Sequence, residues 1–119
     1  MRITIPFKPI SWNVLARQNH WKYTKIFNEM KQITWYAIRA GKKEVFTKPV
    51  DIQVHARWKQ KRRHDIDSLC FKPILDQIVD DGILKDDSIE YVKSVTYTGE
   101  TGADKDELII NIENAKIEV

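Results

Sequence analysis

The chain has 119 residues, of which 42% are hydrophobic and 31% charged, and its formal net charge at pH 7 is +3. This composition and length predict one globular domain, residues 1–119, with no room for a second. No stretch is long and apolar enough for a transmembrane helix or a secretion signal. The single cysteine, Cys70, cannot form an intrachain disulfide. We therefore expect a protein of the reducing cytoplasm.

Charge is distributed unevenly along the chain. Residues 1–63 carry 15 Lys and Arg against 3 Asp and Glu, whereas residues 64–119 carry 5 against 14. Such asymmetry favours the binding of an anionic polymer, with a separate function for the acidic residues. The alternative is that the two halves neutralise each other through solvated salt bridges across the fold.

The first expected element is a strand, because Ile3, Ile5 and Phe7 alternate with polar residues. Pro9 then favours an extended loop that runs to about Tyr23. Long ordered loops in small domains are often functional, so the polar and aromatic residues of this segment are candidates for binding.

A helix is predicted from Thr24, as its N-cap, to Gly41, which stops it. Its apolar residues follow steps of three and four and so share one face: Ile26, Met30, Ile33, Ala37 and Ala40. A strand over residues 50–59 is predicted next, because apolar and polar side chains alternate strictly there.

Two acidic residues follow this strand at a spacing of two, and we call residues 65–67 the acid motif. Asp65 and Asp67 lie on the same side of the chain if the backbone stays extended, which suits metal ligation. The alternative is a turn or helix start in which Asp67 or Ser68 is an N-cap.

A second helix is predicted from the apolar residues between Leu69 and Val79, with Pro73 in its first turn and Gly82 as its stop. Lys72 and Asp76 are four positions apart on this helix, a spacing at which they can pair with each other.

Two pairs of acids flank the loop after this helix. The helix dipole disfavours Asp80 and Asp81 at its carboxyl end, and we interpret them as solvated turn residues. Asp86 and Asp87 come next, and on an extended chain only one of them faces the acid motif. The other is then a supporting residue or a cap.

Two more strands are expected, over residues 89–98 and around residues 108–112, with residues 99–106 as a hairpin loop between them. The resulting order, β-α-β-α-β-β, predicts an α+β domain: a mixed sheet of about four strands with two main helices.

Basic residues stand immediately before the acid motif: Lys59, Lys61, Arg62, Arg63 and His64. Clustered Lys and Arg neutralise a nucleic-acid backbone, whereas clustered Asp repels it. The combination is explained if a hard cation is bound by the acids and contacts the scissile phosphate. The pattern therefore predicts a metal-dependent nuclease.

These motifs are similar to those of the RusA family of phage and prophage Holliday-junction resolvases. The matching residues are His64-Asp65-Ile66-Asp67-Ser68-Leu69, Lys72-Pro73-Ile74-Leu75-Asp76, Asp81-Gly82-Ile83-Leu84, Asp86-Asp87-Ser88, and the opening Ile5-Pro6-Phe7 with Ser11-x-Asn13. The resemblance spans nearly the full chain. Two departures are that Ser68 replaces the usual Asn and that Lys72 lies five positions after Asp67 where four is common. The extra residue turns a regular helix by about 100°.

The resemblance implies a small mixed α/β fold that forms a homodimer, requires Mg²⁺ or Mn²⁺, and nicks four-way DNA junctions in pairs. It implies that Asp65, Asp67 and Asp87 are catalytic metal ligands, with Asp86 beside them, and that Lys72 is the catalytic lysine.

Phosphate contacts are expected from eight basic residues: Arg17, His20, Lys22, Arg57, Lys59, Lys61, Arg62 and Arg63. Trp12 or Trp21 is expected to stack on a base where the junction opens. Two alternative hypotheses are a structure-selective DNA-binding protein without cutting activity and a nuclease for other branched DNA.

Overall fold

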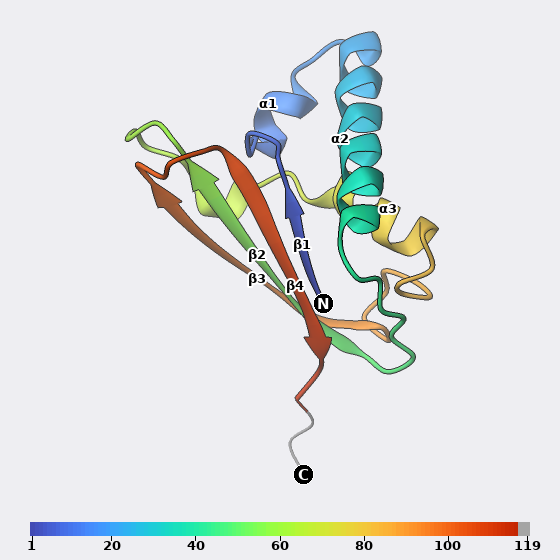
Figure 1. Ribbon diagram of the computed structural model, residues 1–119. Helices are drawn as coiled ribbons and strands as arrows, with labels where there is room; N and C mark the ends of the chain where they lie inside the picture. The colour runs from blue at the N-terminus through green and yellow to red at the C-terminus, as the bar shows by residue number, and fades with distance from the viewer. Residues whose placement is uncertain (117–119) are drawn as a thin grey trace.

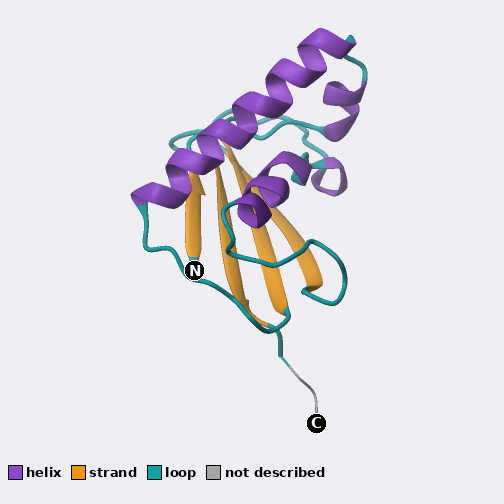
Figure 2. Ribbon diagram, turned by 90° about the vertical axis from the view of Figure 1, so that its right-hand side faces the viewer, coloured by secondary structure: helices purple, strands orange, loops and turns teal. Residues whose placement is uncertain are grey.

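A computed structural model describes residues 1–116, in which a four-stranded sheet is covered by helices (Figure 1). In chain order the elements are β1 (Arg2–Ile5), α1 (Trp12–Ala16), α2 (His20–Ala40), β2 (Val50–Trp58), the 3₁₀ turn η1 (Ile66–Ser68), α3 (Lys72–Asp80), β3 (Val92–Thr101) and β4 (Glu107–Asn114). The turned view in Figure 2 shows α2 and α3 on the same face of the sheet. None of the described helices is long and apolar enough to cross a bilayer.

The strand order across the sheet is β1-β4-β2-β3. β4 runs antiparallel to β1 and β2, whereas β2 and β3 are parallel and need a crossover connection, which contains α3. The predicted α+β domain with a mixed four-stranded sheet is confirmed. The predicted hairpin is wrong, because β4 pairs with both β1 and β2 and so lies two strands away from β3.

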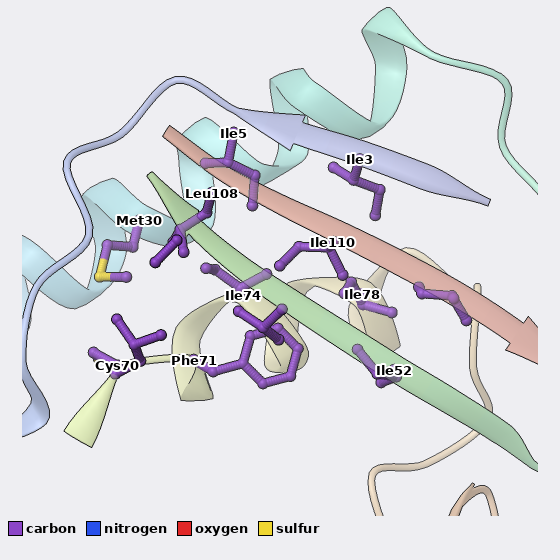
Figure 3. Packing of buried hydrophobic residues seen from close by; sticks show 14 of the residues in the cluster. Ile3, Ile5, Met30, Ile52, Cys70, Phe71, Ile74, Ile78, Leu108 and Ile110 are labelled. Atoms are coloured by element: carbon purple, nitrogen blue, oxygen red, sulfur yellow. The ribbon is translucent and has the colours of Figure 1, made fainter. Parts of the chain in front are cut away.

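The core lies between the sheet and the helices (Figure 3). Every second residue of β2, from Val50 to Trp58, is buried, as the alternation predicts. Ile52 and Ile110 of the sheet share one cluster with Ile74 and Ile78 of α3, and each is at most 1% exposed. Burial of these side chains holds α3, and the segment before it, against the sheet.

The segment between β1 and α2 is not the extended loop that the sequence predicts. Ser11 caps α1 and Asn19 caps α2, each by accepting a hydrogen bond from a backbone N–H two or three residues later. α2 therefore begins at His20, about one turn before the predicted cap, Thr24. The prediction was wrong because the first turn of α2 is largely exposed and has no apolar face that would reveal it.

The turn after α3 contains Gly82 at a φ of 75°, in the left-handed region that glycine favours. Asp80 is exposed, as we expected, but it is paired with a lysine, and Asp81 is not the solvated residue that we expected. Lys31 Nζ lies 2.6 Å from Asp80 Oδ2, Arg39 Nη1 lies 3.1 Å from Asp81 Oδ2, and the Asp81 side chain is only 7% exposed. Cations from α2 thus offset the unfavourable position of both acids at the end of α3.

Candidate active site

The acid motif lies between β2 and α3. Asp65 has extended backbone angles and precedes η1, whereas Asp67 lies within this 3₁₀ turn. The backbone is therefore not extended throughout, and the predicted placement of both carboxylates on one side does not apply. The alternative of a turn is correct, since Asp67 and Ser68 lie within η1, but neither is an N-cap, because Asp65 occupies the cap position of η1 and Phe71 that of α3.

The N-terminal motif is hydrogen-bonded to the segment around the acid motif. The Ser11 hydroxyl donates to Ser68 Oγ over 3.1 Å, although the two residues are 57 positions apart. The Ser68 hydroxyl donates to the Asp65 carbonyl oxygen over 3.4 Å, and the Cys70 N–H donates to the Ile10 carbonyl oxygen over 2.9 Å. Two of the sequence motifs are thus brought together by direct bonds.

Lys72, the first residue of α3, joins two carboxylates. Its Nζ lies 2.7 Å from Asp76 Oδ1, which confirms the predicted pair, and 3.1 Å from Asp87 Oδ2. The hydrogen bond to Asp76, followed by that to Asp87, raises the pKa of Lys72. The same ammonium group lowers the pKa of the Asp87 carboxyl. Asp86 Oδ1 accepts a hydrogen bond from the Asp87 N–H over 2.7 Å, so Asp86 contacts the backbone of Asp87 rather than Lys72.

The step of five residues from Asp67 to Lys72 crosses irregular backbone. Residues 66–68 form the 3₁₀ turn, residues 69–71 are not helical, and α3 begins at Lys72. The rotation of about 100° that an added residue gives in a regular helix therefore does not apply. The added residue is accommodated before the helix begins.

The predicted metal ligands Asp65, Asp67 and Asp87 have suitable chemistry, because hard cations such as Mg²⁺ bind carboxylate oxygens. Within residues 1–116, however, no three His, Cys, Asp or Glu side chains are grouped closely enough to hold a metal ion. Asp87 contacts Lys72, and Asp65 Oδ1 lies 3.6 Å from Arg63 Nε. The donor types fit Mg²⁺ or Mn²⁺, but their present spacing does not form a complete site.

Arg57 is occupied by acidic side chains. Its guanidinium forms ion pairs with Glu100, Asp104 and Glu107, of which Glu107 is only 4% exposed. The hydrogen bond to Glu100 contributes most to raising the pKa of Arg57, so the group stays charged while its donors are engaged. We therefore leave Arg57 out of the surface proposed to contact phosphates.

The other predicted phosphate-binding residues are exposed: Arg17, His20, Lys22, Lys59, Lys61, Arg62 and Arg63. The first three lie around the α1–α2 junction, and the other four lie on residues 59–63, which we call the basic loop. Within the described chain, only Arg63 among these seven forms an ion pair. Their charges are available for an anionic ligand.

His64 does not belong to the cationic block in which the sequence places it. Its ring stacks on Trp58 with centroids 4.2 Å apart, and its Nε2 is buried without a hydrogen-bond partner among the described residues. Burial, followed by the charges of Arg62 and Lys8, lowers the pKa of the imidazole. The ring is therefore mainly neutral at pH 7 and packs as an aromatic side chain.

A hollow of about 440 Å³ beside Lys72 was missed by the sequence analysis, and we call it the Trp12 hollow. It is lined by Trp12, Leu69, Phe71, Lys72, Leu75, Val95 and Tyr97. Its sequence signal is Trp12, which was expected to stack on a base, together with the apolar pair Val95 and Tyr97 on β3. This signal does not distinguish a covered surface from an open one.

Burial raises the pKa of the Cys70 thiol to about 11, which removes it as a nucleophile or a thiolate ligand at neutral pH.

No family model matches the sequence, and no curated protein matches it. The resemblance to the RusA family therefore rests on the motif residues alone and stays a prediction.

Proposed function

We propose that this protein is a metal-dependent endodeoxyribonuclease that selects branched DNA and resolves Holliday junctions by symmetric paired nicks, in recombination or repair. As part of the same proposal, it acts as a homodimer in the cytoplasm. The basis is the family resemblance of the motifs together with the contacts that these motifs make in the fold.

The observation that carries the proposal is the convergence of three motifs that are far apart in sequence. Ser11 bonds to Ser68, directly after the acid motif, and Lys72 bonds to Asp87. An isolated salt bridge would explain the second contact alone. It does not explain why the N-terminal motif and the late aspartate pair both bond to residues 65–72, the segment that contains the acid motif.

Each group has a distinct role in this proposal. The basic loop and the residues around the α1–α2 junction hold the DNA backbone by neutralising phosphates. Lys72 stabilises negative charge that builds on the scissile phosphate, because its ammonium group is held in place by two hydrogen bonds. Ser11 and Ser68 position the backbone that carries Asp65 and Asp67.

Asp65, Asp67 and Asp87 would hold the Mg²⁺ or Mn²⁺, with Asp86 supporting the backbone of Asp87. A bound metal of this kind lowers the pKa of an attacking water and offsets charge on the phosphate. Because Asp87 now contacts Lys72, binding of a cation by Asp87 competes with Lys72 for the same carboxylate.

A homodimer suits the proposed substrate, since a four-way junction presents two equivalent strands. A twofold axis through the dimer places two identical sites for two symmetric nicks. Light scattering of the purified protein measures this directly, and a strict monomer in the presence of junction DNA would remove this part of the proposal.

Asp67→Asn tests the catalytic role of the acid motif while keeping the size of the side chain. Substitutions that only support a metal ligand already cost about 10- to 100-fold, so we expect junction cutting to fall by at least about 100-fold. Junction affinity in EDTA should stay the same or rise, because a repelling charge is lost. Asp104→Asn, on an exposed loop outside the motif, is the matched control and should cut normally.

The second candidate is a structure-selective DNA-binding protein that does not cut. It is favoured by the absence of a grouped set of metal ligands within residues 1–116. Under this hypothesis Mg²⁺ and Mn²⁺ produce no nicks with the unmodified protein. A nuclease for other branched DNA would use the same site and is recognised by faster cutting of flaps than of four-way junctions.

A further inference from the structure

The Trp12 hollow combines aromatic walls with a single charged residue. Trp12 is 38% exposed, and Phe71 and Tyr97 meet edge to face with ring centroids 6.5 Å apart. Lys72 is the only charged side chain among the lining residues, and the remaining ones are apolar. A hollow of about 440 Å³ is within the usual size range of small-ligand sites.

The lining of this hollow offers one cation and no carboxylate, which suits an anionic ligand with an aromatic part, and the same ammonium group also contacts Asp76 and Asp87 outside the lining. Its lining contains no Asp or Glu, whereas a second hollow beside His64, lined also by Tyr97, includes Glu100. The chain has no acidic residue before Glu29, so α1 contributes no negative charge. A phosphate near Lys72 and a ring against Trp12 are both compatible with these surroundings.

We propose that the Trp12 hollow receives one unstacked base of the bound DNA strand, while the phosphate next to that base lies at Lys72. This inference rests on the proposed function and adds a base-binding site to it. Lys72 belongs both to the hollow and to the contact with Asp87, so a single nucleotide can occupy both regions. Trp21 is 87% exposed and is not among the lining residues, which makes Trp12 the stacking residue of the two.

A base-binding hollow also gives a reason for selecting branched DNA. Unstacking a base is least costly where the base is mismatched, unpaired or already strained. A junction offers such bases at its branch point, whereas a continuous duplex does not. The hollow therefore favours the branched substrate without reading its sequence.

The test measures affinity in EDTA for junctions that are intact or carry one abasic nucleotide, placed in turn at each position near the branch point. Trp12→Ala should weaken binding of the intact junction by roughly fivefold or more, as expected for loss of one stacked base. The loss should shrink to within about twofold on the junction that lacks the accommodated base. Trp35→Ala is the matched control, since Trp35 is 39% exposed and lies elsewhere, under Arg39.

An equal loss for Trp12→Ala on intact and on every abasic junction, or no loss at all, overturns the inference even if the protein binds and cuts junctions. If the protein neither binds nor cuts branched DNA, the proposed function fails, and this inference fails with it. Trp12 also meets Tyr23 edge to face, so Trp12→Leu, which keeps apolar bulk but removes the ring, is measured alongside and must give the same abasic dependence.

Discussion

Lys72 is held between two carboxylates. For this reason we expect its removal to change the rate of cutting much more than the affinity for DNA. Its ammonium is hydrogen-bonded to Asp76 and Asp87, so part of its charge is already balanced in the free protein. We expect Lys72→Ala to lower the rate of junction cutting by about 100-fold, with affinity changed by less than about threefold. Single-turnover cutting and EDTA binding assays measure the two quantities. Lys85→Ala is the control, and equal cutting by both variants would remove Lys72 from the mechanism.

His64 gives the fold a pH dependence whose sign follows from its surroundings. Burial and the nearby charges of Arg62 and Lys8 lower its pKa, against a smaller opposing effect of Asp106. The unfolded chain therefore binds this proton more readily than the folded one. The stability that His64 contributes is complete above about pH 6.5 and declines as the pH falls from there toward the lowered pKa.

His64→Phe keeps a ring against Trp58 but cannot take up a proton. Urea midpoints at about pH 7.5 and about pH 5.5 should show a larger fall for the unmodified protein than for this variant. The comparison between the two proteins cancels the contributions that they share. An equal fall in both would show that His64 is protonated as easily in the folded chain as in the unfolded one.

Among the elements, the start of α2 gives a direct test of the structure against the sequence prediction. Asn19 accepts the capping bond, so Asn19→Ala should lower the free energy of unfolding by about 1 kcal/mol. Thr24 lies inside the exposed part of the helix, where Thr→Ala is neutral or slightly stabilising. Urea denaturation measures both. The reverse order of effects would place the helix start where the sequence pattern first predicted it.

Elements with a buried, periodic face could be predicted from the sequence, and elements defined by long-range contacts could not. β2 was predicted correctly because its apolar and polar residues alternate from Val50 to Trp58. α1 is five residues long with only Leu15 buried, so its sequence has no periodic signal. The position of β4 between β1 and β2 depends on pairing between distant strands, which alternation within one strand does not report.

The candidate site also contains features that could be predicted from the sequence and features that could not. The acids, Lys72 and the basic loop could be named from residue types and spacing, because charged clusters are visible in a sequence. The engagement of Arg57 by three acids and the burial of His64 could not, since both depend on neighbours brought together by folding. The Trp12 hollow was missed because its lining residues come from three separate parts of the chain.

Across the whole molecule, the basic and acidic halves of the chain partly neutralise each other. Lys31 pairs with Asp80, Arg39 with Asp81, and Arg57 with acids of the last two strands. The charge count alone left open that salt bridges between the two halves neutralise them, and this is the case for those residues. The basic loop is different, because Lys59, Lys61 and Arg62 form no ion pair within the described chain.

The salt dependence of DNA binding distinguishes the two groups of cations. Each phosphate contact contributes about −0.9 to the slope of log affinity against log salt concentration. Replacing Lys59, Lys61 and Arg62 together with Gln should therefore reduce the magnitude of the slope by about 2 to 3. Replacing Lys31 and Arg39, which are already paired, should change it by less than about 1. Equal changes for the two variants would contradict a DNA surface centred on the basic loop.

The most direct test of the account is cutting of a labelled mobile four-way junction and a matched linear duplex by the purified protein, with Mg²⁺ and with EDTA, alongside Asp67→Asn. We predict paired symmetric nicks near the branch point, on the junction only, with metal only, and only with the unmodified protein. Binding of the junction without any nick in Mg²⁺ or Mn²⁺ would contradict the nuclease proposal and leave a structure-selective DNA-binding protein.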